Sequence, residues 1–285
     1  MIECIPNFSE GRDKGVLAAL EHAAGGTLLD IHADPDHNRS VFTLIGNEKA
    51  IAEAVFAMAA EAVRLIDLNK HEGEHPRMGA VDVIPFVPLK GAAMSDCVAL
   101  ANEAAKRIAR ELSLPVFLYE ETATAPERKN LAEVRRHNFA KWQPDYGPPA
   151  PHPTAGAVAV SARKPLIAFN INLATPDINI AKKIAEAVRG SSGGLAHCKA
   201  LGMYLHARGI AQVSMNLTDY EKTPIHRVFE LVRTEAARYG TFIAGSELVG
   251  LAPSRALFDC AEHFLQMEGF DSNKHVIENA ADRIP

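Results

Sequence analysis

Residues 166–190, LIAFNINLATPDINIAKKIAEAVRG, show the pattern of a strand followed by a helix most clearly. Apolar side chains at Ile167, Phe169 and Ile171 alternate with small or carboxamide side chains, which is typical of a strand with one buried face. After Pro176, apolar residues recur at helical spacing over residues 178–190. A strand followed by a helix indicates that the second half of the chain mixes both kinds of element.

The same reasoning extends in both directions along the chain. The second half continues as two strands, a helix and a strand, and a last helix starts at Pro253, which gives the order βαββαβ with a tail. The first half has the same order up to Val87, so we predict an α/β (α+β) fold of two ferredoxin-like split βαβ subdomains with mixed sheets and helices on the outer faces. Helices are expected at 51–66, 97–112, 178–190 and 224–240, and strands at 3–8, 27–32, 39–46, 81–88, 114–119, 166–173, 197–206, 210–217 and 241–248.

Prolines crowd the segment FAKWQPDYGPPAPHPTAG, residues 139–156, so we expect a loop or linker there. Polar residues of the neighbouring strands are mostly carboxamides, as in AQVSMNL, residues 211–217, where Gln212, Ser214 and Asn216 share one face. That face is either an ordinary solvated surface or a platform for a planar ligand rich in heteroatoms, because carboxamides offer donors and acceptors without charge.

Composition excludes several classes of function. The formal charge of −5 gives no general attraction to nucleic acid or anionic lipid, so anionic ligands must be held by local cations. No apolar run approaches the roughly 18 residues of a membrane span, and the start MIECIPNFSEG lacks the basic region of a signal peptide. The scattered cysteines Cys4, Cys97, Cys198 and Cys260 predict neither disulfides nor a zinc ribbon, so we expect a cytoplasmic protein.

Three motifs suggest a hydrolase or a metal site. His71-Glu72-Gly73-Glu74-His75 matches the HExxH pattern of zinc proteases, but Gly73 and the following proline disfavour the helix that pattern needs. The sequence GSSGG at 190–194 matches GxSxG but follows a helix rather than a strand. The group Asp34, Asp36 and His37 is better explained as a turn. We therefore predict no metal, with a zinc hydrolase kept as an alternative.

Four polar segments remain, and together they resemble the glutamate formimidoyltransferase family. They are IPNFSEG, DHNRS, KHEGEHPRMGAVDVIPF and SARKPLIAFNIN, and the resemblance extends through AQVSMNL and GSELVGLAP. It implies folate-dependent transfer of a formimino group between N-formimino-L-glutamate and tetrahydrofolate, a step of histidine degradation. It also implies two α/β subdomains with a ligand tunnel between them. The family's subdomain organisation favours a boundary that divides residues 1–176 from residues 177–285.

The resemblance assigns the residues of the site. It makes His75 the catalytic acid/base, a role that suits imidazole because the attacking nitrogen must lose a proton and the departing nitrogen must gain one. Asn38, Arg39 and Arg77 are expected to bind substrate anions. The folate-binding stretch corresponds to Ser161, Ala162, Arg163, Lys164, Pro165, Leu166, Ile167, Ala168, Phe169 and Asn170.

The sequence departs from animal members of the family at one position. They carry an acid where this chain has His32, so Asp34 or Asp36 is left as the candidate for orienting His75. The resemblance also suggests a homodimer and a separate cyclodeaminase that processes the product. The alternatives are a sister transferase acting on formylglutamate or formiminoglycine and a non-catalytic folate-binding module.

Overall fold

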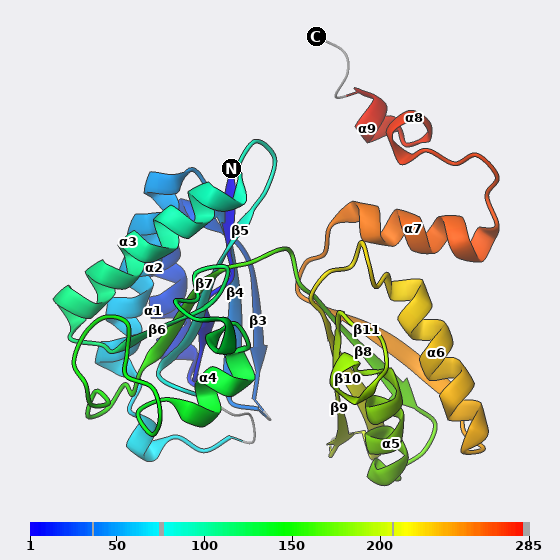
Figure 1. Cartoon of the computed structure of the whole chain (residues 1–285), viewed down its shortest axis with the longest axis horizontal. Coiled ribbons are helices and arrows are strands. Elements are labelled where there is room, and N and C mark those ends of the chain that lie inside the picture. The colour runs from blue at the N-terminus through cyan, green and yellow to red at the C-terminus, as the bar shows by residue number, and fades with distance from the viewer. Residues whose placement is uncertain (36, 74–76, 207, 282–285) are drawn as a thin grey trace. The chain divides into compact units, whose positions relative to one another are not determined.

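The computed structural model describes residues 1–35, 37–73, 77–206 and 208–281, and the chain divides into two compact units, Met1–Lys164 and Pro165–Pro285 (Figure 1). Each unit contains one β-sheet with helices packed on it. The prediction of a mixed α/β protein is therefore confirmed. Among the described residues, none of the helices combines the length and the hydropathy of a membrane-spanning segment.

The first unit contains a seven-stranded sheet in the order β1-β4-β2-β5-β7-β6, with β3 paired to β4. β5, β7 and β6 are parallel, and the other pairs are antiparallel. The elements are β1 (Ile2–Cys4), β2 (Asn7–Phe8), α1 (Lys14–Ala24), β3 (Leu28–Asp34), β4 (Arg39–Gly46), α2 (Glu48–Leu65), β5 (Val81–Pro88), α3 (Met94–Leu112), β6 (Val116–Glu120), α4 (Leu131–His137) and β7 (Val158–Ala162), with 3-10 turns at Gly25–Thr27, Leu68–Lys70 and Pro126–Arg128.

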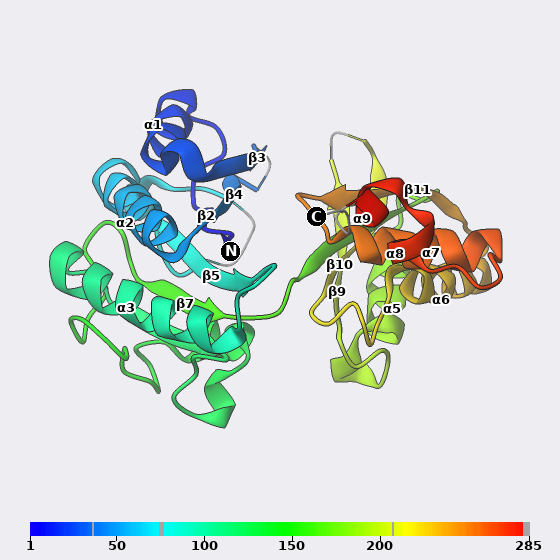
Figure 2. The ribbon, with the colours of Figure 1, turned by 90° about the horizontal axis from the view of Figure 1, so that it is seen from above.

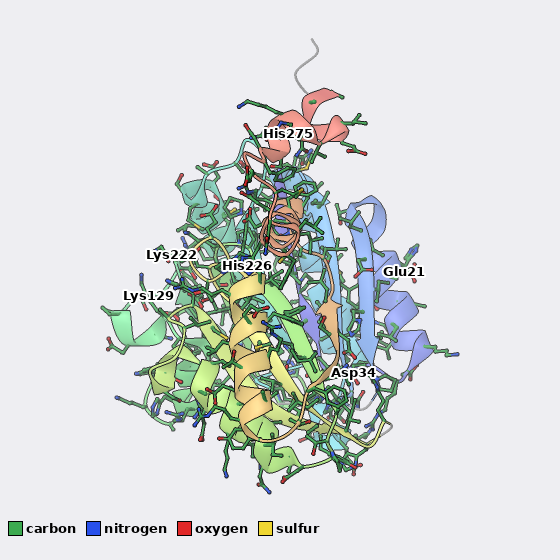
Figure 3. The ribbon with its side chains drawn as sticks, turned by 90° about the vertical axis from the view of Figure 1, so that its right-hand side faces the viewer. Glu21, Asp34, Lys129, Lys222, His226 and His275 are labelled. Atoms are coloured by element: carbon green, nitrogen blue, oxygen red, sulfur yellow. The ribbon has the colours of Figure 1, made fainter. Side chains whose placement is uncertain are left out.

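The two faces of this sheet are covered differently. Helices α1, α2 and α3 lie on one face and enclose the main core (Figures 1 and 2). At the β6 end, Phe117 and Tyr119 point to the opposite face and pack with Val134 of α4 in a second, smaller cluster. Helices were expected on one face of the sheet only. Helix α4 is the exception, because successive side chains of β6 are apolar on both faces of the strand, and α4 covers the second face.

The proline-rich segment 139–156 lies within the first unit as an ordered loop. No strand was expected at residues 158–162, where β7 follows this segment and inserts between β5 and β6. Backbone hydrogen bonds hold the loop on the unit, from Leu68 N to Thr154 O at 2.8 Å and from Val116 N to Tyr146 O at 2.9 Å. The segment is therefore a loop, as predicted, but it joins two strands of one sheet.

The second unit has a four-stranded antiparallel sheet in the order β11-β8-β10-β9. Apolar side chains on one face pack with α5 and α6, which lie side by side on that face (Figures 1 and 2). The division into compact units thus places β8 wholly in the second unit, while the subdomain boundary at 176–177 stays a prediction. The elements are β8 (Ile167–Leu173), α5 (Ile178–Val188), β9 (Cys198–Leu205), β10 (Ile210–Leu217), α6 (Ile225–Arg238), β11 (Ile243–Val249), α7 (Ser254–Leu265), α8 (Ser272–His275) and α9 (Ile277–Ala281), with a 3-10 turn at Gly190–Ser192.

Candidate active site

Three loops meet at one end of the first sheet, and Asn38 ties them together. Its Oδ1 accepts a hydrogen bond from Gly11 N at 3.0 Å, and its Nδ2 donates to Glu72 O at 3.0 Å. The side chain is buried, and φ is 47°, a left-handed conformation that asparagine tolerates better than most residues. Three of the polar segments singled out in the sequence are thus brought together, and Asn38 holds the backbone there.

The predicted catalytic residue, His75, lies outside the described residues, as does the whole of Glu74–Pro76. The chain on either side of this gap is packed against the loop at 37–38. A Cβ added at Gly73 would fall 2.5 Å from His37 O, so glycine permits the close approach there. After the gap, the guanidinium of Arg77 donates to His37 O at 3.3 Å and to Asn38 O at 3.4 Å.

His71 is a second histidine at the junction of these loops. Its Nδ1 lies 3.4 Å from Asn38 Nδ2. Burial, and then the positive charge of Arg77, lower the pKa of His71 below its ordinary value, so the ring is neutral near pH 7. Residues 71–73 are not helical, and the described residues contain no cluster of three metal-ligating side chains, so nothing in this part of the chain supports the zinc-protease interpretation.

A carboxylate that the sequence analysis missed lies beneath these loops. Asp82 is completely buried in β5. Its Oδ1 accepts from Met78 N at 2.8 Å, and its Oδ2 accepts from Arg39 Nη1 at 2.7 Å and Arg135 Nη2 at 2.5 Å. Burial raises the pKa of Asp82, but the two guanidinium groups and the Met78 N–H lower it by more, so the net pKa lies below the ordinary value. Asp82 is therefore ionised.

A register shift explains why Asp82 points at the arginines. Val81 pairs with Phe8 and Val83 pairs with Asn7, so Asp82 is an extra residue in β5 opposite β2. Simple alternation would have placed Asp82 with the core residues Ile84 and Phe86. In the sequence, the buried carboxylate is indicated by a single acid within the apolar run VDVIPFVP, because acids are rarely buried without a partner.

Arg39 links three neighbouring strands at this point. Besides its ion pair with Asp82, it donates from Nη2 to Asn7 Oδ1 at 2.7 Å and from Nε to the same oxygen at 3.2 Å. The pairing of β3 with β4 sets His32 opposite Val41 and Asp34 opposite Arg39. His32 and Asp34 therefore share a face of the sheet with Arg39. The Asp34 carboxylate accepts from His37 N at 3.0 Å, as expected of a turn, and Asp36 lies outside the described residues.

The predicted folate-binding stretch, residues 161–170, joins the two units. Ser161 and Ala162 end β7, whereas Ile167 and Phe169 are core residues of the second unit. Arg163 N donates to Phe86 O at 2.9 Å, and Arg163 Nη1 donates to Lys164 O at 3.0 Å. Arg163 thus lies beside Phe86 in β5, four residues along that strand from Asp82.

Asn170, at the end of this stretch, lies on the polar face of the second sheet. Next to it, Gln212 Nε2 donates to Asn172 Oδ1 at 2.8 Å, and Asn172 Nδ2 donates to Glu247 Oε1 at 2.8 Å. Arg208 Nη1 also donates to Glu247 Oε1 at 2.8 Å. The predicted carboxamide face is confirmed, and the sequence analysis did not foresee that the ion pair of Glu247 with Arg208 lies on it.

Two family models match the chain along nearly its whole length. The formiminotransferase domain, N-terminal subdomain, matches residues 1–163, and the formiminotransferase domain matches residues 168–284. The chain belongs to the formiminotransferase family. Both models of this formiminotransferase family begin and end close to the limits of the compact units, Met1–Lys164 and Pro165–Pro285.

Curated relatives agree with this assignment. The chain is 51% identical to a glutamate formimidoyltransferase of Streptococcus pyogenes serotype M1, with 98% of each chain covered. It is 45% identical to one of Thermoplasma acidophilum, with 99% of this chain and 98% of the relative covered. It is 42% identical to the formimidoyltransferase-cyclodeaminase of Mus musculus, covering 94% of this chain and 53% of that protein. These formiminotransferase relatives confirm the predicted enzyme class, a transferase.

Proposed function

We propose that the chain transfers a formimino group between N-formimino-L-glutamate and tetrahydrofolate, giving 5-formiminotetrahydrofolate and L-glutamate as a step of histidine degradation. The proposal rests on one observation, the meeting of the described loops at 9–11, 37–39 and 71–73, which the hydrogen bonds of Asn38 join. The near full-length similarity to two proteins named glutamate formimidoyltransferase supports it.

His75 is the proposed general acid/base. Attack of the N5 nitrogen of tetrahydrofolate on the amidine carbon forms a tetrahedral intermediate, and the attacking nitrogen must then lose a proton. The departing amino group of glutamate must gain one before the carbon–nitrogen bond breaks. One imidazole with a pKa near neutrality can accept the first proton and donate the second.

Folate is proposed to bind along Ser161–Asn170 as a co-substrate, in a tunnel between two ferredoxin-like split βαβ subdomains divided at residues 176–177. The mixture of Arg163 and Lys164 with carboxamides on the second sheet supports this, because the glutamate tail is anionic and the pterin ring has donors and acceptors. Asn38, Arg39 and Arg77 are proposed to serve the amino-acid substrate, Asn38 through the backbone that it positions.

The remaining proposals follow from the family. We propose a cytoplasmic homodimer that uses no metal and passes 5-formiminotetrahydrofolate to a separate cyclodeaminase. The Mus musculus relative is named formimidoyltransferase-cyclodeaminase, and a single protein named for both activities supports a functional link between them.

The test compares the wild-type protein with His75→Ala. We expect wild type to convert N-formimino-L-glutamate and tetrahydrofolate, and His75→Ala to lose turnover while retaining tetrahydrofolate affinity by equilibrium dialysis. Substantial turnover by a well-folded His75→Ala would contradict the assigned role. Assays with formylglutamate and formiminoglycine identify a sister transferase, and folate binding by wild type without any transfer identifies a binding module. Activity lost to a chelator and restored by zinc would indicate the metal hydrolase.

A further inference from the structure

The group formed by Arg39, Asp82 and Arg135 has a charge that its own members do not balance. Arg39 comes from β4, Asp82 from β5 and Arg135 from α4, and both guanidinium groups donate to the same oxygen, Asp82 Oδ2. One carboxylate against two guanidinium groups leaves a charge of +1 on these three side chains. They are mostly buried, with 15% of the Arg39 side chain and 18% of the Arg135 side chain exposed.

A second ion pair in the same unit shows what a purely structural pair looks like. Arg128 Nη1 binds Asp145 Oδ1 at 3.0 Å and Nη2 binds Oδ2 at 2.7 Å, so one guanidinium matches one carboxylate through two parallel bonds. Arg135, by contrast, shares its acceptor with Arg39 through a single nitrogen. Its Nη1 has no hydrogen-bond partner in the described part of the chain, so a donor remains for a ligand.

The other oxygen of Asp82 does not provide the missing acceptor. Oδ1 accepts a hydrogen bond from Met78 N, and both guanidinium groups bind Oδ2. Neither arginine therefore binds both oxygens of Asp82. Arginine is the side chain best suited to bind a carboxylate through two N–H groups, and a mostly buried cation gains most from an anion beside it.

We propose that Arg135, which Asp82 holds beside Arg39, forms a subsite that binds a carboxylate of a substrate through its Nη1. Asp82 is a positioning residue that acts through Arg135. The inference rests on the proposed function for the identity of the ligand, because N-formimino-L-glutamate and the glutamate tail of folate both carry carboxylates. In a protein of charge −5, such a local cationic site is what an anionic substrate requires.

The experiment uses Arg135→Gln in the full chain, with Arg136→Gln as the matched control. Arg136 is the next residue on α4, keeps 65% of its side chain exposed and pairs with Glu133 instead. We expect Arg135→Gln to raise the KM of one substrate about 10- to 100-fold, the range for a lost charge-assisted hydrogen bond, while kcat changes little. Arg136→Gln should keep both values of wild type.

Substrate variants identify the source of the carboxylate. A rise in KM for N-formimino-L-glutamate alone assigns the subsite to the amino-acid substrate. A rise for tetrahydrofolate that disappears with tetrahydropteroate, which lacks the glutamate tail, assigns it to folate. Unchanged KM values in Arg135→Gln, or a fall in kcat alone, would overturn the proposal.

A binding measurement separates this inference from the transferase assignment. We expect glutarate, a simple dicarboxylate, to raise the Tm of wild type and of Arg136→Gln but not of Arg135→Gln, whether or not the chain turns over. If Arg135→Gln does not fold, Arg135→Lys replaces it, because lysine keeps a cation beside Asp82 but lacks the second N–H group that would bind the ligand. Arg135→Lys should show the same loss of the Tm response to glutarate. An equal Tm shift in all folded variants would overturn the carboxylate subsite.

Discussion

Asp82 accepts the backbone N–H of Met78 at 2.8 Å, so a completely buried carboxylate fixes the chain just after the segment that carries the predicted acid/base. The same carboxylate binds Arg39 and Arg135. A single side chain therefore joins β5, β4, α4 and the loop after position 75. Its removal should affect both the stability of the first unit and the geometry of the site.

Asp82→Asn should destabilise the protein strongly. The substitution leaves two mostly buried guanidinium groups without their shared anion, and breaking a buried pair in this way costs about 3–5 kcal/mol. Denaturant unfolding followed by circular dichroism measures the change. Glu53→Gln is the control, because Glu53 is largely exposed and pairs with Arg107 at the surface, where such pairs contribute about 1 kcal/mol or less. Equal effects of the two substitutions would contradict the role given to Asp82.

The stability of wild type should fall in acid partly through Asp82. Its pKa is lowered in the folded protein, so the ionised carboxylate stabilises the fold fully above the ordinary value of 3.8 and loses this contribution as pH drops through the lower native value. We expect the stability difference between wild type and Asp82→Asn to shrink below pH 3.8. Urea unfolding over a pH series tests this, and a difference that stays constant into strong acid would count against it.

Asn38→Ala should cost more stability than Asn38→Gly. Both substitutions remove the hydrogen bonds to Gly11 and Glu72, at about 1–3 kcal/mol. Alanine in addition must adopt the left-handed conformation, which costs roughly 1–2 kcal/mol, whereas glycine adopts it freely. Denaturant unfolding gives the order of the two variants, and faster hydrogen exchange at the Gly11 amide in both should report the lost side-chain acceptor.

His71 should titrate below its ordinary pKa of 6.5. Burial and the charge of Arg77 disfavour the imidazolium in the folded state. The unfolded chain therefore takes up this proton first, and the folded state loses relative stability as pH falls from 6.5 towards the lower native value. NMR titration of the ring measures the pKa directly, with His71→Gln identifying the resonance. A native pKa at or above 6.5 would refute the assigned environment.

Local sequence patterns predicted the regular elements well. Residues 39–46 and 81–88 form β4 and β5 with the expected bounds, because their apolar runs end at clear turn residues. β7 and α4 are among the elements that these patterns did not predict. β7 follows a proline-rich segment and has small residues on one face, and α4 is a short helix with Val134 as its only buried residue among those described. Tertiary contacts with β5 and β6 define both elements more than their own sequences do.

The candidate site was only partly predictable for a similar reason. Arg39 and Arg77 lie in recognisable polar segments, and the structure places both near the loop junction. Asp82 and Arg135 could not be paired from the sequence, since a local shift of strand register directs one and the position of a distant helix directs the other.

The interior position of β7 has a consequence for synthesis of the chain. Parallel pairing joins Val83 to Ala159 across a long intervening segment, so the first sheet stays incomplete until nearly all of the first unit has left the ribosome. Until then, β5 and β6 each present an open apolar edge, a form of surface that promotes aggregation. A nascent chain released before residue 158 would therefore be a substrate for chaperones, even though it contains every other strand of that sheet.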